Sequence, residues 1–210
     1  MKLIYRGAEA DLLLGKWAGE KAIHKVRKPL PYRLEELDKA IRSQRTLHEA
    51  SMIHSARSAG VRTPYLYFVN PASALIVMEY IEGERMKTVI DRAPDETMIN
   101  LCERFGEGVA TLHTAGIMHG DITTSNIIVR DSELVFIDFG LSLHSARLED
   151  HAVDLRLIKE TLNGAHSRIA SAAFGALLEG YKVKVGEARL EATKRKLSEI
   201  ERRGRYAKVE

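Results

Sequence analysis

The first eighty residues alternate between short apolar runs and glycines, a pattern that predicts a small β-sheet. Apolar-rich runs occupy residues 2–5, 11–17 and 20–26, and glycines lie between them. Such spacing is typical of strands joined by hairpin turns. Two further strands are predicted at residues 65–70 and 74–80.

One helix interrupts these predicted strands. Apolar residues recur at near-helical spacing from Leu34 to Ile53, and Gly60 and Pro64 end the pattern. The last strand leads into the tetrad Ile81-Glu82-Gly83-Glu84. Because a glycine punctuates the chain there, we predict a hinge at this tetrad.

Beyond the hinge the hydrophobic period becomes helical. Apolar positions between Met98 and Leu112 step by three and four residues, which predicts a long core helix. Pro94-Asp95 is expected to supply a turn and a capping side chain in front of it. Two small strands are predicted at residues 126–129 and 134–137.

The periods along the chain predict an α+β protein with two lobes. Residues 1–82 are expected to form an antiparallel sheet with one main helix. Residues 83–210 are expected to form a mostly helical lobe, in which residues 148–203 contribute two or three helices.

Composition narrows the class of protein without naming a function. Hydrophobic residues make up 45% of the 210 positions and charged residues 29%, which excludes a disordered or low-complexity chain. The one cysteine, Cys102, excludes an internal disulfide framework and a thiolate-cluster zinc site, and is expected only to pack in the core. Charges near the amino terminus and short apolar runs predict a soluble, cytoplasmic protein without a membrane contact.

Charge is unevenly distributed along the chain. Residues 182–210 carry a net charge of +5, whereas the preceding 181 residues carry −2. A basic segment of this kind indicates an anionic partner, although an exposed helix end without a partner is the alternative. The cations singled out in this basic tail are Lys194, Arg195, Lys196, Arg202, Arg203, Arg205 and Lys208.

Two carboxylate motifs carry the candidate chemistry. His119-Gly120-Asp121 is followed by Asn126, and Asp138-Phe139-Gly140 lies 17 residues after Asp121. Phosphoryl transfer needs a carboxylate that orients the nucleophile, here Asp121, and an Asp with an Asn, here Asp138 and Asn126, that hold Mg²⁺ against ATP phosphates. With HGDITTSN in place of H-R-D-x-x-x-x-N, and an unchanged DFG, the sequence resembles the protein-kinase superfamily.

The resemblance assigns roles to further residues of the first lobe. Ala22-Ile23-His24-Lys25 matches the V-A-I-K pattern, so Lys25 is expected to bind ATP phosphates, with Glu49 on the helix as its ion-pair partner. Glu35 and Glu36 are rivals for the partner role, and ordinary surface charges are the alternative for Lys25 and Glu49. His119 is expected to fix the catalytic loop.

The nucleotide-binding loop and the hinge are less clearly marked. Where kinases carry G-x-G-x-x-G, this chain offers only Gly7-Ala8-Glu9-Ala10, so fewer unhindered amides face the phosphates and a modest nucleotide affinity is expected. Backbone groups of Glu79 and Ile81 are expected to meet adenine. A buried edge strand that ends in a glycine turn explains the same residues equally well.

One branch of the superfamily fits the whole chain. Seventy residues follow Gly140, and they contain no Ala-Pro-Glu and little room for a peptide-docking platform. The chain resembles the small, RIO-like atypical kinase subunit of the KEOPS (EKC) complex. The elements that carry this resemblance include GAEA, Lys25-Val26-Arg27, HGDITTSN, IDFGLS, the segment Glu149-Asp150 to Asp154-Leu155 and the terminal Arg202-Arg203-Gly204-Arg205.

That resemblance, rather than composition or spacing, implies the biology. It implies a minimal bilobal kinase-like fold with a shortened helical second lobe, ATP and Mg²⁺ as cofactors, and Asp154 as a brace for the catalytic loop. Its partners would be a tRNA threonylcarbamoyl transferase and a further small KEOPS subunit. ATP hydrolysis would support threonylcarbamoyladenosine formation in tRNAs that read ANN codons, with serine/threonine phosphorylation as a lesser activity, and the basic tail would contact tRNA.

Three alternatives remain at this point. Aminoglycoside and choline kinases also use H-G-D-x-x-x-x-N, but they need an added helical region to enclose the acceptor. A pseudokinase scaffold would bind partners without turnover, although the residues for turnover are present. A stand-alone regulatory protein kinase would need the docking platform that the short carboxyl end lacks.

Overall fold

The first half of the molecule is a five-stranded antiparallel sheet with strand order β1-β2-β3-β5-β4. The computed structural model describes the backbone of residues 1–206 and the side chains of residues 1–203. The strands are β1 (Lys2–Arg6), β2 (Ala10–Trp17), β3 (Glu20–Arg27), β4 (Leu66–Asn70) and β5 (Leu75–Glu79). Each lies within one residue of the strand that the apolar runs predict, so the predicted sheet is confirmed.

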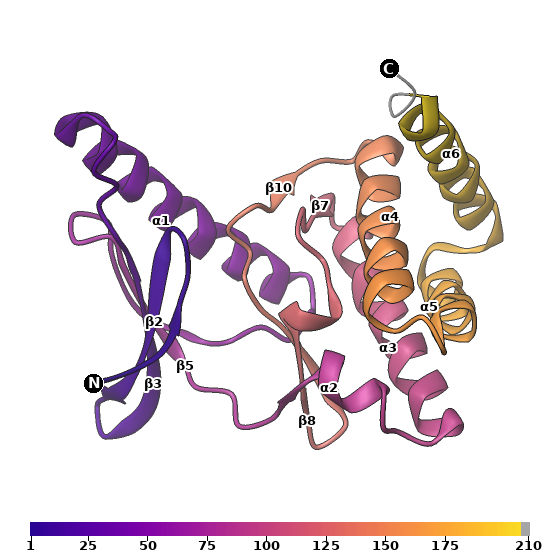
Figure 1. Cartoon of the computed structure of the whole chain (residues 1–210), viewed down its shortest axis with the longest axis horizontal. Helices are drawn as coiled ribbons and strands as arrows, with labels where there is room; N and C mark the ends of the chain where they lie inside the picture. Colours follow the sequence, from indigo (N-terminus) through magenta and orange to yellow (C-terminus); the bar gives the residue numbers. More distant parts are fainter. Residues whose placement is uncertain (207–210) are drawn as a thin grey trace.

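One long helix, α1 (Glu35–Ser58), lies along this sheet (Figure 1). Acidic residues in its first turn suit the positive end of the helix dipole. Its buried face contains Glu49 among apolar residues such as Ile53, while Leu37 and Leu47 are exposed. The helix ends before Gly60, whose φ of +98° turns the chain into β4. α1 therefore buries the carboxylate of Glu49 beside apolar residues, and its buried residues also include Asp38 and Thr46.

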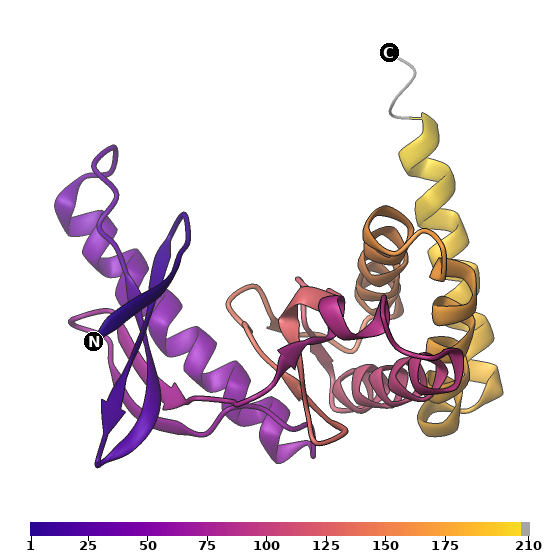
Figure 2. The same cartoon turned by 60° about the horizontal axis from the view of Figure 1, so that its bottom comes forward.

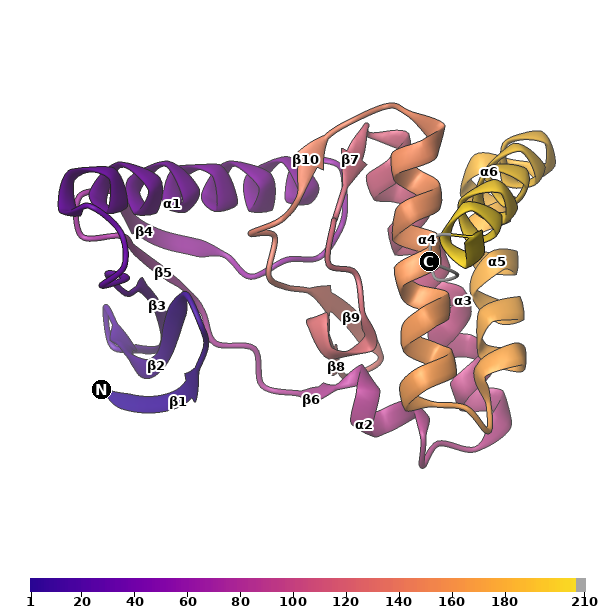
Figure 3. The same cartoon turned by 45° about the horizontal axis from the view of Figure 1, so that its top comes forward.

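The second half is mostly helical, as Figures 1 and 3 show. Its helices are α2 (Met86–Ile90), α3 (Asp95–Thr114), α4 (Leu148–Ala165), α5 (Ala170–Val185) and α6 (Glu187–Tyr206). Its short strands and 3-10 turn are β6 (Glu84–Arg85), β7 (Ile117–Met118), η1 (Thr124–Asn126), β8 (Ile127–Arg130), β9 (Glu133–Phe136) and β10 (Leu143–His144). The strands form two small sheets, β6-β8-β9 and β10-β7, on the side of the helical block that faces α1.

Two local predictions need correction. Asp95 does not cap α3: Pro94 occupies the cap position, no side chain caps the helix, and Asp95 is already its first residue. Asp95 and Glu96 lie in the first turn, where their charges favour the helix dipole instead. Asn126 does not begin a strand either, since it ends η1 and β8 begins one residue later.

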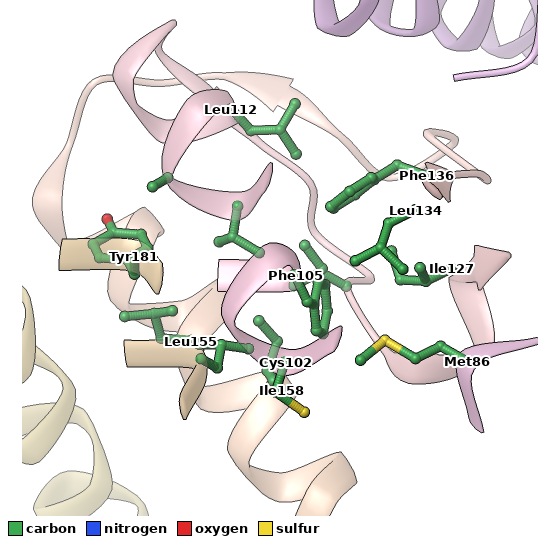
Figure 4. Packing of buried hydrophobic residues seen from close by; sticks show 14 of the residues in the cluster. Met86, Cys102, Phe105, Leu112, Ile127, Leu134, Phe136, Leu155, Ile158 and Tyr181 are labelled. Carbon is green, nitrogen blue, oxygen red and sulfur yellow. The ribbon is translucent and has the colours of Figure 1, made fainter. Parts of the chain in front are cut away.

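The core of the second half lies where α3 crosses α5. Gly106 and Gly180 allow this crossing, because a Cβ at Gly106 would lie 1.9 Å from the carbonyl oxygen of Leu177. Around the crossing, large apolar side chains from α3, α4, α5 and the small strands pack together (Figure 4). Cys102 is among them, and its burial raises the pKa of its thiol to about 12. It is therefore a packing residue, as expected.

The carboxyl-terminal helix α6 packs on α4 and α5 at the outer edge of the helical block, seen most clearly in Figure 2. Of the predicted basic tail, Lys194 to Arg203 lie on this helix. The Arg205 side chain and Lys208 lie outside the residues described. Across residues 1–206, none of the helices combines the length and the apolar character needed to cross a membrane.

Candidate active site

The loop His119-Gly120-Asp121 is held by a buried carboxylate of α4. Asp154 on α4 is fully buried and accepts hydrogen bonds from the backbone N–H groups of His119 at 2.7 Å and Gly120 at 2.9 Å. Gly120 has φ +81°, and a Cβ there would lie 2.4 Å from the carbonyl oxygen of Leu141, so only glycine fits. The backbone of the loop that carries Asp121 is thus fixed by the two hydrogen bonds to Asp154 and by the glycine at position 120.

A second buried layer supports Asp154. His113 on α3 donates from Nε2 to Asp154 at 3.1 Å, and its Nδ1 accepts from the Tyr181 hydroxyl at 2.9 Å. The His113 ring also stacks on His151, with centroids 4.2 Å apart. These four residues, which we call the Asp154 network, tie the catalytic loop to α3, α4 and α5.

His119 belongs to the scaffold of this loop. Its side chain is fully buried against Phe139, and its backbone carbonyl accepts a hydrogen bond from the Ser142 hydroxyl at 2.8 Å. Burial lowers the pKa of His119 below its ordinary value, although the nearby carboxylates oppose this. A buried neutral imidazole suits the structural role that the sequence predicts for it.

Asp121 and Asn126 form one hydrogen-bonded unit at the mouth of the loop. The Asn126 amide nitrogen donates to the Asp121 carboxylate at 2.9 Å and to its backbone carbonyl at 2.8 Å. Both bonds use the amide nitrogen, so the side-chain carbonyl oxygen of Asn126 is left to ligate a cation. The tight 3-10 turn η1 ends at Asn126, so its side chain lies within hydrogen-bond distance of Asp121.

Asp138 lies in a strained backbone conformation directly after the small strands. Its φ is +63°, in the left-handed region that residues other than glycine rarely adopt, and such strain is typical of functional sites. Its Oδ1 accepts from Lys25 Nζ at 2.8 Å. Burial works against the ionised carboxylate, but the Lys25 ammonium outweighs it and lowers the pKa of Asp138.

Lys25 is held between two carboxylates, one from each half of the molecule. Its Nζ lies 2.7 Å from Glu49 Oε1 and 2.8 Å from Asp138 Oδ1. Burial alone would lower the pKa of Lys25, yet the charges of Glu49 and Asp138 together raise it. Glu49, rather than Glu35 or Glu36, is therefore its ion-pair partner, and Glu35 pairs instead with Lys39 on the exposed side of α1.

An open cavity of about 420 Å³ joins these residues. Of the sequence-predicted set it brings together Lys25, Asp121, Asp138 and the turn from Gly7 to Ala10. Glu49 reaches it through Lys25, and Asn126 reaches it through Asp121. The remaining wall residues are Tyr5, Leu12, Arg27, Arg45, Gly140 and Leu141.

The Gly7–Ala10 turn covers the cavity as the β1–β2 connection. The Gly7 N–H donates to the Ala10 carbonyl at 2.9 Å, and the Lys28 ammonium donates to the Gly7 carbonyl at 2.9 Å. Glu9 forms an ion pair with Arg45 of α1 across the opening. The turn is therefore held in place at Gly7 and at Glu9.

Glu79 and Ile81 lie at the hinge side, outside the cavity lining. The Glu79 N–H donates to the Tyr65 carbonyl at 2.8 Å, and its carboxylate pairs with Arg62 at 2.8 Å. Ile81 is buried. Their contact with adenine stays a prediction, and for Glu79 the backbone carbonyl is the group that could make it.

The donor set suits a hard divalent cation. Lys25 occupies one oxygen of Asp138, which leaves the second, and Asn126 contributes its carbonyl oxygen. Carboxylate and amide oxygens next to phosphates are what Mg²⁺ prefers. Asp138 and Asn126 would hold the ion, whose chemistry is to neutralise charge on phosphate oxygens.

Arg27 and Arg45 line the cavity but were not predicted as site residues. Arg27 lies two positions after Lys25 on β3, so strand alternation places both side chains on the same face. This signal was available in the sequence for Arg27. The Glu9–Arg45 pair joins residues 36 positions apart, and only the tertiary packing of α1 reveals it.

Comparison with known proteins places this geometry in a family. Residues 20–160 match the family model described as a protein kinase domain. The chain is 40% identical over 212 residues to the KEOPS complex subunit Bud32 of Pyrococcus abyssi, covering 98% of this chain and 96% of that protein. The match to Bud32 therefore includes both halves of the molecule.

Longer relatives and a solved structure extend the picture. The chain is 42% identical over 204 residues to a probable bifunctional tRNA threonylcarbamoyladenosine biosynthesis protein of Methanothermobacter thermautotrophicus, and spans 36% of that protein's length. Its fold is similar to Rio2 kinase of Chaetomium thermophilum, solved as an ADP/Mg²⁺–phosphoaspartate complex, with TM-score 0.58 and 16% identity over 95% of this chain and 72% of that one. This likeness confirms the bilobal kinase-like α+β fold. The chain belongs to the protein kinase superfamily and, within it, to the Bud32 family.

Proposed function

We propose that this chain is an ATP-dependent atypical kinase and ATPase that works as a subunit of a KEOPS-type complex. The observation that carries the proposal is Lys25, held by Glu49 and Asp138 in the cavity that Asp121 also lines. A cation fixed between two carboxylates beside an open cavity is suited to polyphosphate, because phosphate oxygens can share its N–H groups. Its Bud32 relative carries the name of such a complex.

Each site residue has a separate task in this proposal. Lys25 holds phosphate oxygens, and Glu49 keeps its ammonium in place. Asp138 and Asn126 hold Mg²⁺, and Asp121 orients the attacking hydroxyl or water and accepts its proton. Backbone groups at Glu79 and Ile81 take the adenine, while the Gly7–Ala10 turn covers the phosphates.

We infer the wider role from the names of the relatives. The probable bifunctional relatives combine a region similar to this chain with further sequence in one protein for threonylcarbamoyladenosine biosynthesis. ATP turnover here would support that modification of tRNA, in contact with a threonylcarbamoyl transferase and a further small KEOPS subunit. The cytoplasm is the compartment that we propose for it.

The basic tail is proposed to contact tRNA, and its ion pairs reduce the charge that it offers. Lys194 pairs with Glu191 and Lys196 with Glu199, each at 2.7 Å, and Arg203 pairs with Glu149 at 3.1 Å. Such exposed pairs are weak, so phosphates can displace them. Arg195 and Arg202 line the same shallow groove of α6 and are the cations that we expect to contribute most.

Of the alternatives, a small-molecule phosphotransferase is not favoured, because a relative matched over nearly its full length is a KEOPS complex subunit Bud32. A pseudokinase scaffold would bind partners without turnover. Against it stand Lys25, Asp121, Asn126 and Asp138, all present and mutually oriented. Measured ATP turnover distinguishes a pseudokinase scaffold from the proposed enzyme.

The experiment is an ATP hydrolysis assay on the chain alone, with a purified transferase subunit, and with that subunit plus tRNA. We expect slow turnover alone and faster turnover in the assembled reaction. Substituting Arg195→Ala with Arg202→Ala should flatten the salt dependence of tRNA binding by the complex, by up to about 0.9 in log slope for each phosphate that is no longer neutralised. Hydrolysis that is absent in all three mixtures would contradict the proposed enzyme, and an unchanged slope would contradict only the tail contact.

A further inference from the structure

Arg27 combines burial with an incompletely bonded guanidinium. Its side chain is 6% exposed and lines the cavity. Nη2 donates to Glu49 Oε2 at 2.6 Å, whereas Nε and Nη1 are buried and have no hydrogen-bond partner among the described residues. Buried N–H groups without acceptors are costly and rare in folded proteins. A charged group in this condition at a cavity wall is suited to a ligand that brings acceptors.

The position of Arg27 along β3 indicates which part of a nucleotide it would meet. Ala22 lies opposite Glu79 in the sheet, so β3 leads away from the hinge toward Lys25 and then Arg27. Arg27 lies opposite Ala10, at the end of the turn that covers the cavity. Two residues of strand add about 7 Å beyond Lys25. A nucleotide with its base at the hinge would thus bring its distal phosphates toward Arg27.

Glu49 and Gly140 complete this corner of the cavity. The two oxygens of Glu49 hold one cation each, Oε1 the Lys25 ammonium and Oε2 the Arg27 guanidinium. Gly140 lies beside them, because a Cβ there would be in van der Waals contact with Asp138 Oδ1 at 3.4 Å and with Arg27 Nη2 at 3.6 Å. One buried carboxylate therefore sets the spacing of two cations that face the same cavity.

We propose that Arg27 is a second cationic ligand of the nucleotide and contacts its terminal phosphate, an inference that rests on the proposed ATP site. Lys25 offers a point charge, whereas the planar guanidinium of Arg27 can donate two parallel N–H bonds to one phosphate. The site would then recognise the length of the polyphosphate chain. ATP gains the Arg27 contact, ADP gains less, and AMP gains nothing.

The competing role for Arg27 is purely structural, in which it only holds Glu49. Nucleotide affinities separate the two roles. Isothermal titration of the full chain with ATP, ADP and AMP, each with Mg²⁺, should show that Arg27→Met weakens ATP binding about tenfold or more, ADP binding less, and AMP binding not at all. Methionine keeps the apolar stem and removes the N–H groups.

Arg42→Met is the matched control. Arg42 also donates to a buried carboxylate of α1, Asp38, at 2.6 Å, but it lies outside the cavity lining. We expect the affinities for all three nucleotides to be unchanged in this variant. If Arg27→Met fails to unfold cooperatively on heating, Arg27→Lys replaces it, since lysine keeps the positive charge and loses the planar guanidinium. We expect Arg27→Lys to weaken the binding of ATP most, of ADP less and of AMP not at all.

The difference between ATP and ADP separates the two roles, because only ATP carries the terminal phosphate that Arg27 is proposed to contact. Equal weakening of ATP, ADP and AMP in Arg27→Met, or an unchanged ATP affinity, would overturn the inference. Those results leave the proposed function intact, provided that Lys25→Ala still lowers ATP affinity. Absence of binding by the wild-type chain to all three nucleotides would instead refute both.

Discussion

Two clusters of polar side chains in this molecule differ in how completely their hydrogen-bonding groups are satisfied. The cavity cluster, Lys25 with Arg27, Glu49 and Asp138, lies between the two halves and consists of full charges. Asp138 is 49% exposed at its side chain, and Arg27 retains N–H groups without acceptors among the residues described. This cluster is open toward a ligand.

The Asp154 network, by contrast, is closed. Asp154 is one carboxylate with both oxygens occupied, by two backbone N–H groups and by His113. The Tyr181 hydroxyl donates a hydrogen bond to the second ring nitrogen of His113. No ligand is needed to satisfy these groups, so the network contributes to stability and to the shape of the catalytic loop. The comparison separates residues that bind from residues that position, and mutation should separate them as well.

The largest expected effect is on turnover, from Asp138→Asn. The substitution removes a negative Mg²⁺ ligand and weakens the bond to Lys25 in a nearly isosteric side chain. ATP turnover should fall by about three orders of magnitude, roughly 4 kcal/mol of transition-state stabilisation, while the thermal midpoint changes little. Asp131→Asn is the control, because Asp131 also has a positive φ but lies exposed in the β8–β9 turn. Full activity in folded Asp138→Asn would contradict the assignment.

The next effect is on stability, from Asp154→Asn. The amide can accept only one of the two backbone N–H bonds and turns a donor toward the other, which leaves a buried group unpaired. We expect a decrease of about 3 kcal/mol in the free energy of unfolding, seen as a fall of roughly 6 to 12 °C in the thermal midpoint. Asp150→Asn on the same helix is the control, since its bond from Ser145 tolerates an amide oxygen. A midpoint equal to that of the wild-type chain would show that the network is not needed for stability.

Within the cavity cluster, Lys25 and Glu49 should behave as one unit. Lys25→Ala and Glu49→Ala should each weaken ATP binding by about ten- to a hundredfold, and the double variant should be little worse than the worse single variant. Titration calorimetry on the four proteins of this cycle measures the coupling. Strictly additive effects would mean that the two side chains act independently, as surface charges do.

A smaller, pH-dependent effect is expected from His151 in the second region. Its Nε2 donates to the Ser145 carbonyl and its Nδ1 accepts from Arg189, so the imidazole is neutral. Burial, reinforced by His113 and Arg189, lowers the pKa of His151 to about 4. Because the folded pKa lies below the unfolded value near 6.5, this contribution is complete above that value and is lost as the pH falls toward 4.

We expect the free energy of unfolding to decrease by about 2 kcal/mol over this interval, in addition to the effects of other groups. Denaturant unfolding of the wild-type chain and of His151→Gln, followed from pH 7 to pH 4, measures the difference. Parallel curves for the two proteins would show that His151 does not titrate in this range.

The sequence was sufficient for the parts of the fold and site that local pattern determines. The strands of the first sheet, α1 and α3 follow from apolar periodicity, and the positions of Asp121, Asn126 and Asp138 follow from motif spacing. Lys25 and Glu49 could be paired because a lysine near the end of a strand and a glutamate on the next helix are expected to meet.

The remainder depends on contacts between distant parts of the chain. The Asp154 network joins His113 to a tyrosine 68 positions away, and the Glu9–Arg45 pair arises only when α1 packs beside the turn. No local period encodes such contacts. The unsatisfied N–H groups of Arg27 could not be predicted from the sequence for the same reason, since whether a donor lacks an acceptor depends on every neighbour that surrounds it.

The central claim is that the cavity cluster binds nucleotide and the Asp154 network does not. The most direct measurement is the rise in thermal midpoint that Mg²⁺-ATP produces in the wild-type chain, in Lys25→Ala and in Asp154→Asn. Ligand binding to the folded state raises the midpoint. We predict a rise for the wild-type chain and for Asp154→Asn, which begins from a lower midpoint, and little or none for Lys25→Ala. Equal rises in Lys25→Ala and the wild-type chain would contradict the claim.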